Sequence, residues 1–262
     1  MILRFASFLG DNGFEFYRQV VAYLGAATGL PTEMVRDTSA GMDALFANGM
    51  LAGAFGCGLL YVRKAAESEP LVRLLAAPVM SPARYGDRPV YFSDVIVRHD
   101  SPFHTFDDLR GATFAYNEEI SLSGYVLPRY HWQRQGEDLL TFFGALVKSG
   151  SHARSMDWVQ AGRADCAAID SVVLEMEFLQ RPARRQAFRI VAGAGPATMP
   201  PVMASAQLDP LTHEQLAEAL TGMHLTEAGR AVLQGGGVRR FARVTDSDYD
   251  DIRHILKVME GS

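Results

Sequence analysis

The chain has 262 residues, of which 48% are hydrophobic and 21% are charged, and its formal net charge is −5. This composition is globular, and the length allows one large domain or two lobes of roughly 100–150 residues each. An acidic chain without a basic face is not expected to bind nucleic acid or an anionic membrane surface.

Strand-like and helix-like segments alternate through the first third of the chain. In "FEFYRQVVAYLGAATG" the apolar residues recur at helical spacing, and Gly29 follows them as a stop signal. Strands are predicted at 3–9, 33–37, 51–56 and 71–79, and helices at 14–29, 40–49 and 59–68. This alternation is typical of a mostly parallel sheet flanked by helices.

A second α/β unit is predicted after a longer strand at 90–100. Its strands are expected at 112–117, 164–170 and 188–193, and its helices at 152–162 and 171–180. Two prolines in "MPPVMASA" restrict the backbone before a short extended run. The chain then ends in helices expected at 212–223, 226–236 and 246–259. Thr212 and Gln215 fit a capping box at the start of the first of these helices.

The cysteines and the N-terminus bear on disulfides, metal sites and localisation. Cys57 and Cys166 lie far apart in sequence, so separate buried thiols are the simpler interpretation, and a disulfide depends on their distance. No Cys/His cluster predicts a metal site, and no cofactor is expected. "MILRFASFL" lacks the ordered regions of a signal peptide, and no run approaches the length of a membrane span. The chain as written is therefore expected in the cytoplasm, or in the periplasm if an export segment has been removed.

The stretch "EEISLSGYVLPRY" follows a predicted buried strand and contains Ser121 and Ser123 at the start of a helix. A helix start carries unpaired amides and partial positive charge, and small residues let a ligand approach those amides. Serine hydroxyls add donors, so the turn can hold an oxyanion without Arg or Lys. The alternative is that either serine only caps its own helix.

Two further polar positions follow neighbouring predicted strands. His152 lies at another strand-to-helix junction, and Asp170 ends the next strand. Because carboxyl ends of parallel strands share one edge of the sheet, where ligands bind, these residues are expected to converge with Ser121 and Ser123. The simpler alternatives are a capping or surface histidine at His152 and a helix cap at Asp170.

The segment "SDVIVRHDSPFHTFDDLRGATFAYNEEISLSGYVLPRY" resembles the phosphonate/phosphite/phosphate solute-binding proteins of ABC transporters, whose Ser-Thr-Ser-Gly-Tyr turn holds the oxyanion. "GSHARSMDWVQAGRADCAAIDS" and "MPPVMASAQLD" are similar to later segments of that family, and "AGMDALFANGMLAGAFGCGLLY" is similar to an earlier one. The resemblance covers nearly the whole chain and is strongest from 93 to 171.

The resemblance implies an α/β fold of the two-lobed periplasmic-binding-protein type II class, each lobe a mostly parallel sheet flanked by helices. Residues 1–94 and 200–262 would form one lobe and residues 95–199 the other. Extended crossovers are expected near Tyr91–Val95 and Pro201–Ala204, and the lobes would close on a ligand as a hinge.

The resemblance also implies site residues and partners. Ser121 and Ser123 would donate to the oxyanion, His152 would hydrogen-bond it, and Asp170 would contact a polar part of the ligand. The remaining predicted ligand-binding residues are Tyr91, at the crossover, Ser39, in the first lobe, and Leu122, within the turn. Strand packing for Tyr91 and a helix cap for Ser39 are the alternatives. The partners would be a small anionic ligand and an ABC transporter permease.

The turn departs from the family pattern in two ways. It reads Ser-Leu-Ser, so Leu122 removes a hydroxyl that the family usually supplies. Glu118 and Glu119 directly precede it, and carboxylates facing an anion pocket would oppose a doubly charged phosphate. Solvated side chains are the simpler interpretation. Carboxylates facing the pocket would favour a zwitterion or a less charged ligand.

Two other functions stay open at this point. A hydrolase is not favoured, since there is no G-x-S-x-G elbow or glycine-rich phosphate loop, and His152 directly follows Ser151. The other alternative keeps the fold but makes the chain a leaderless cytoplasmic ligand sensor, or a binder of a heterocycle such as a thiamine-precursor pyrimidine. The sequence therefore predicts a solute-binding protein for a phosphonate-like oxyanion.

Overall fold

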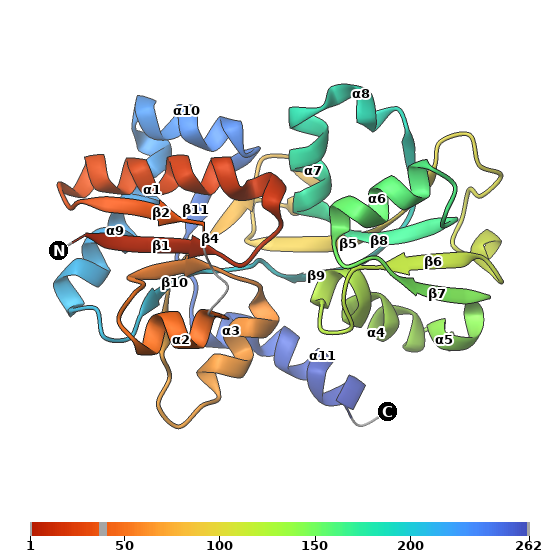
Figure 1. The fold of residues 1–262 in the computed structure, drawn as a ribbon, viewed down its shortest axis with the longest axis horizontal. Coiled ribbons are helices and arrows are strands. Elements are labelled where there is room, and N and C mark those ends of the chain that lie inside the picture. Colours follow the sequence, from red (N-terminus) through yellow and green to blue (C-terminus); the bar gives the residue numbers. More distant parts are fainter. Residues whose placement is uncertain (1, 37–40, 261–262) are drawn as a thin grey trace. The chain divides into compact units, whose positions relative to one another are not determined.

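The structure is a computed structural model that describes residues 2–36 and 41–260 (Figure 1). The chain folds into two compact units. Unit 1 comprises Met1–Val90 with Thr198–Ile252, and unit 2 comprises Tyr91–Ala197 with Arg253–Ser262. Each unit has its own sheet. Pro201–Ala204, expected at a crossover, lies wholly within unit 1.

The sheet of unit 1 has six strands in the order β11-β4-β10-β3-β1-β2 and is mixed. β1 pairs in parallel with β2 and β3, whereas β10 runs antiparallel to β3 and β4, and β11 antiparallel to β4. The parallel part therefore comes from the first strands of the chain. The bounds are β1 (Leu3–Ser7), β2 (Thr32–Val35), β3 (Gly53–Phe55), β4 (Val72–Met80), β10 (Val202–Ser205) and β11 (Val238–Ala242).

Helix α1 (Phe14–Thr28) forms where the sequence predicts it. Tyr17, Val20 and Leu24 share its buried face because they recur at helical spacing, and the Tyr17 ring stacks on Phe55 of β3 at 4.3 Å. Gly29 ends the helix in the left-handed region, with φ 72°, which favours glycine. The α1 helix contacts α9 and α10.

The other helices of unit 1 lie between and after its strands (Figure 1). They are η1 (Asp11–Gly13), α2 (Gly41–Ala47), α3 (Gly58–Ala65), η2 (Ala83–Tyr85), α9 (Pro210–Gly222), η5 (Met223–Leu225), α10 (Glu227–Gly235), η6 (Asp246–Tyr249) and the first residues of α11 (Asp250–Glu260). Both cysteines, Cys57 before α3 and Cys166 in unit 2, are free thiols.

The predicted capping box at Thr212 is wrong. Helix α9 begins two residues earlier, at Pro210, and its cap is Asp209, whose side chain accepts a hydrogen bond from the Thr212 amide at 2.9 Å. Proline suits the first helical position because that residue needs no N–H donor.

The sheet of unit 2 has five strands in the order β7-β6-β8-β5-β9. β6 is parallel to β7 and β8, and β5 is antiparallel to β8. The carboxyl ends of β6, β7 and β8 therefore meet at one edge, together with the amino end of β5. The bounds are β5 (Val90–Arg98), β6 (Thr113–Tyr116), β7 (Ala145–Lys148), β8 (Cys166–Asp170) and β9 (Phe188–Thr198).

Two apolar groups stabilise unit 2. A buried cluster includes Ile96 and Ile169 of the sheet with Met156 and Val159 of α6. A separate aromatic group stacks Phe106 on Trp132 of α4 at 4.0 Å. The helices are η3 (Asp107–Leu109), the π-helix η4 (Leu122–Val126), α4 (Leu127–Gln133), α5 (Leu139–Phe142), α6 (His152–Gln160), α7 (Ser171–Gln180) and α8 (Pro182–Arg185). Within residues 2–36 and 41–260, no helix is long and apolar enough to cross a membrane.

Candidate functional site

The candidate site lies at the carboxyl edge of the unit 2 sheet. Asn117 directly follows β6, Ser149 directly follows β7, and Asp170 ends β8. The loops after β6 and β7 are joined by backbone hydrogen bonds, from Ser149 N to Tyr116 O at 2.7 Å and from Gly150 N to Asn117 O at 3.0 Å. This edge is where open α/β sheets bind ligands.

The serine turn is a capped helix start. The Ser121 hydroxyl oxygen accepts a hydrogen bond from Gly124 N at 3.1 Å, so Ser121 caps its own helix. The Tyr125 and Val126 amides both donate to the Ser121 carbonyl, at 3.2 and 3.0 Å, which widens the first turn into a π-helix. The first amides of a helix have no partner inside it and give that end partial positive charge. The turn therefore offers backbone donors as well as the proton of the Ser121 hydroxyl.

Gly124 is required by a close approach. A Cβ atom at this position would lie 1.8 Å from Asn117 Oδ1 and 2.8 Å from Asn117 Cγ. Contacts that short do not occur in folded proteins, so any side chain here would displace Asn117 or the turn. The glycine thus lets the turn lie directly against the loop that follows β6.

His152 contacts the serine turn from the first residue of α6. Its Nε2 lies 3.1 Å from Ser123 Oγ and 3.4 Å from Asn117 Nδ2. Burial lowers the pKa of His152 to about 4, and the Ala168 carbonyl opposes that shift. The ring is therefore neutral at pH 7 and brings no cation to the site.

Two polar atoms of this group lack hydrogen bonds. Within the described part of the chain, the buried Asn117 Oδ1 and His152 Nδ1 have no hydrogen-bond partner. Buried polar groups are usually hydrogen-bonded, and an exception is a reason to look for a function. Asn117 Oδ1 lies against the serine turn at Gly124, and His152 contacts the same turn through its other ring nitrogen, Nε2.

Asp170 caps helix α7 and is held close to neutrality. Its Oδ1 accepts hydrogen bonds from the Val172 and Val173 amides at 2.8 and 3.4 Å. These are the contacts of a helix cap, which is the alternative that the sequence offered for this residue. Burial raises the pKa of Asp170 to about 7, and the nearby Asp94 carboxylate raises it further, against the helix amides and the Ser123 hydroxyl. The carboxyl group is therefore partly protonated near neutral pH.

Ser93 is a site residue that sequence reasoning missed. It pairs with Asp170 in the β5–β8 register and is fully buried. Its hydroxyl donates to the Ser123 carbonyl at 2.5 Å, which fixes the position of the serine turn. Asn117 was also missed, although it ends a predicted strand, which is the same signal that identified Asp170.

The structure brings three predicted residues together: Ser123, His152 and Asp170. Ser121 caps the same turn, whereas the Leu122 side chain is 2% exposed and the Tyr91 side chain 1% exposed, so both are shielded from solvent. Ser39 lies outside the described residues. Ligand contact by any of these residues stays a prediction.

Glu118 and Glu119 are ion-paired at the surface. Lys148 Nζ lies 2.5 Å from Glu118 Oε2 and 2.8 Å from Glu119 Oε2. The Lys148 ammonium, followed by the Glu119 amide and the Tyr116 hydroxyl, lowers the pKa of Glu119 to about 2. Both glutamate side chains are exposed, as the simpler interpretation of the sequence predicts. The sequence did not indicate that they share one lysine.

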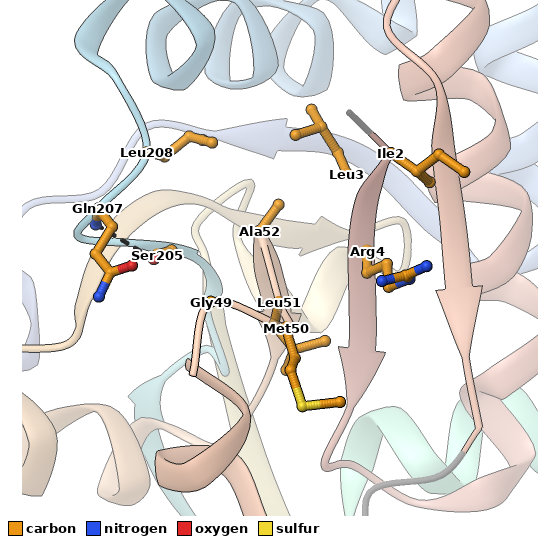
Figure 2. A pocket seen from close by; sticks show the side chains of 10 residues that line it. All are labelled: Ile2, Leu3, Arg4, Gly49, Met50, Leu51, Ala52, Ser205, Gln207 and Leu208. Atoms are coloured by element: carbon orange, nitrogen blue, oxygen red, sulfur yellow. Dashed lines mark hydrogen bonds between the residues drawn. The ribbon is translucent and has the colours of Figure 1, made fainter. Parts of the chain in front are cut away.

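A cavity of about 360 Å³ lies elsewhere, in unit 1 (Figure 2). Its walls include Leu3 and Arg4 at the start of β1, Leu51 and Ala52 before β3, and Met50. It therefore lies at the amino ends of parallel strands and contains no predicted site residue. Across residues 2–36 and 41–260, no group of three or more His, Cys, Asp or Glu side chains is placed to hold a metal ion.

Solved structures show which class of protein this fold defines. The chain superimposes on PhnD1 from Prochlorococcus marinus, solved in complex with methylphosphonate, with a TM-score of 0.81 and 17% identity, covering 99% of this chain and 98% of that one. A binding protein component of an ABC phosphonate transporter from Pseudomonas aeruginosa gives a TM-score of 0.80 at 16% identity, covering 97% and 85%. The predicted periplasmic-binding-protein type II fold is confirmed.

A more distant neighbour carries a different ligand. A Xanthomonas citri protein bound to ATP matches with a TM-score of 0.68 and 19% identity, covering 98% of this chain and 96% of that one. At these identities the neighbours establish the fold alone. No match was found among curated proteins.

The family follows from the sequence itself. The family model described as "ABC transporter, phosphonate, periplasmic substrate-binding protein" matches residues 6–249. The chain belongs to this family. The predicted family is thereby confirmed, and its description is that of a substrate-binding component of a transporter.

Proposed function

We propose that this chain captures a small phosphonate-like oxyanion at the carboxyl edge of the unit 2 sheet for ABC-type uptake. The observation that carries the proposal is the cluster of Asn117, Ser123 and His152 at a helix start, with buried polar atoms that lack partners. A helix start that presents amides to a polar, glycine-lined turn is a common way to bind an anion.

The proposed roles follow from hydrogen-bonding chemistry. The Leu122 and Ser123 amides and the Ser121 and Ser123 hydroxyls would donate to the oxyanion, and His152 would add a neutral ring. Asp170, partly protonated near pH 7, would donate to an anion oxygen or accept from a cationic group of a zwitterion. Tyr91 and Ser39 remain predicted contacts. Hinge closure on binding and delivery to a permease complete the proposal.

Calorimetric titration tests the ligand class and the site together. The probes are methylphosphonate, aminoethylphosphonate, phosphite, phosphate and sulfate, with a thiamine-related pyrimidine as the competing class. We expect Ser123→Ala and His152→Ala each to weaken binding of the best oxyanion by at least about tenfold, since a hydrogen bond to a charged group contributes roughly 1.5–3 kcal/mol.

Matched controls lie at the opposite edge of the same sheet. His99 and Ser101 follow the carboxyl end of β5, which pairs with the amino end of β8. His99→Ala and Ser101→Ala should leave affinity unchanged. Full affinity in both site variants would disprove the site, and binding of the pyrimidine alone would disprove the oxyanion class.

Small-angle scattering tests the proposed hinge closure separately. Saturation with the best oxyanion should decrease the radius of gyration. An unchanged scattering curve at saturating ligand would contradict closure and leave the binding site unaffected.

A further inference from the structure

The carboxylates beside the serine turn are held by one lysine. Lys148 ends β7, pairs in register with Tyr116 of β6, and contacts both Glu118 and Glu119. The Tyr116 hydroxyl donates to Glu119 Oε1 at 2.9 Å. Two carboxylates and one ammonium give this group a net charge of −1.

This charged group adjoins the proposed anion site. The Ser121 amide donates to the Glu118 carbonyl at 3.0 Å, so the chain folds back and Glu118 lies against the helix cap. Glu119 is two residues from Ser121, which limits their Cα separation to about 7.6 Å. Exposed charges act on one another over about one Debye length, which is about 8 Å at physiological salt, so this group is near enough in the chain to influence an anion bound at the turn.

The contacts of the Lys148–Glu118–Glu119 group lie at the surface. The side chains of Lys148, Glu118 and Glu119 are 45%, 43% and 52% exposed. Ion pairs at such positions contribute little to folding. The charges of these side chains can still act on an anion bound nearby, whatever the ion pairs contribute to folding. Removing the Lys148 ammonium would leave the two glutamate carboxylates uncompensated.

We propose that the Lys148–Glu118–Glu119 group sets the charge preference of the site, with Lys148 limiting the repulsion that the two carboxylates exert on the bound oxyanion. This inference rests on the proposed function. It makes Lys148 a specificity-determining residue that acts through charge and not through contact with the ligand. The site should therefore accept a monoanion more readily than its dianionic analogue.

A series of variants separates charge from structure. Glu118→Gln with Glu119→Gln gives the group a charge of +1. Glu118→Gln alone gives 0, and so does the triple variant in which Lys148 also becomes Gln. The wild type has −1, and Lys148→Gln has −2. Arg129 and Arg154, the cations on the adjoining helices, are unchanged throughout.

Affinity should follow charge and not the number of ion pairs retained. We expect each step to change methylphosphonate affinity roughly threefold at low ionic strength, and less at high salt. The order is +1 tightest, the two neutral variants equal, then wild type, then Lys148→Gln weakest. The titrations are done above the second pKa of methylphosphonate, where it is a dianion, and its monomethyl ester, a monoanion, should then show about half the free-energy change per step. Lys148→Arg keeps the charge and should keep wild-type affinity.

Lys64 in unit 1 supplies the matched control. It contacts two carboxylates in the same way, Asp43 at 2.6 Å and Glu67 at 2.8 Å. Lys64→Gln changes the net charge of the chain equally and should leave methylphosphonate affinity unchanged.

The outcomes distinguish the two proposals. If every variant that breaks an ion pair binds more weakly than the wild type, the group only positions the loop and the charge inference is wrong. Equal affinity across the series, with Ser123→Ala still impaired, also overturns it while the proposed function stands. If the wild type binds none of the oxyanion probes, both proposals fail.

Discussion

The serine turn of unit 2 and the cavity of unit 1 lie at opposite kinds of sheet edge. The turn is at the carboxyl ends of parallel strands, where Asn117, His152 and Asp170 gather. The cavity is at the amino ends, with about 360 Å³ of space and walls such as Leu3 and Met50 (Figure 2). The serine turn adjoins buried polar atoms without hydrogen-bond partners, whereas the cavity is distinguished only by its size.

Volume alone does not mark a binding site. Partial positive charge at helix starts and buried polar atoms without partners give a reason for an anion to bind. The Arg4 guanidinium at the cavity is already paired with Glu33 at 2.7 Å. The two regions should therefore respond very differently to substitution.

Gly124→Ala should produce the largest effect. The added Cβ would lie 1.8 Å from Asn117 Oδ1, so the Asn117 side chain or the turn must move. We expect loss of detectable oxyanion binding and destabilisation by about 1–3 kcal/mol, typical of overpacking. Calorimetry measures the first, and urea unfolding followed by tryptophan fluorescence measures the second, since Trp132 and Trp158 both lie in unit 2.

Gly222→Ala is the control for this substitution. Gly222 ends α9, and a Cβ there would meet no heavy atom within 4 Å. It should stabilise the chain by about 0.4–1 kcal/mol and leave binding unchanged. Equal behaviour of the two alanine variants would contradict the close approach at Gly124.

Asp170 and His152 should oppose each other in the pH dependence of stability. The pKa of Asp170 is raised from 3.8 to about 7, so the folded state binds more protons between these values and stability falls as pH rises. The pKa of His152 is lowered from 6.5 to about 4, so the unfolded state binds more protons and stability rises with pH. Between about pH 4 and 6.5 the two slopes, each up to about 1.4 kcal/mol per pH unit, offset one another.

Single substitutions should expose each slope. Asp170→Asn can still cap α7 but no longer titrates, so only the contribution of His152 remains. The free energy of unfolding should then increase with pH more steeply than in the wild type. His152→Gln leaves the aspartate term and should gain a negative slope. Urea unfolding at intervals from pH 4.5 to 6.5 measures both, and curves parallel to wild type would contradict the assigned pKa shifts.

Met50→Ala should give the smallest effect. Met50 is 50% exposed at the cavity, and exposed substitutions usually change stability by no more than about 0.5 kcal/mol. Oxyanion affinity should stay at the wild-type value. A tenfold loss of methylphosphonate affinity would make the cavity, and not the serine turn, the functional region.

The local signals in the sequence predict much of the fold and part of the site. Helix α1 ends at Gly29 as its stop signal indicates, and Ser123, His152 and Asp170 converge because they follow neighbouring parallel strands. The start of α9 was misplaced because Thr212 has capping chemistry of its own, while Asp209 before a proline is the better cap.

Contacts between distant residues could not be predicted in the same way. Lys148 reaches Glu119 across 29 positions, through a parallel pairing that no local pattern encodes. Ser93 supports Ser123 because antiparallel β5 brings it opposite Asp170, and a mostly parallel sheet gave no reason to expect that register. The mixed sheets of both units have the same origin, since strand direction depends on long-range pairing.

The π-helix at Leu122–Val126 has a consequence for helix phase. Each residue advances an α-helix by about 100°, so one extra residue in the first turn rotates the residues before it by that amount relative to the residues after it. Ser123 can therefore contact His152 while Trp132, on the continuing α4, stacks on Phe106. The widened turn therefore sets the rotation between the start of the serine turn and helix α4, and a change of one residue in this turn would alter that rotation by about 100°.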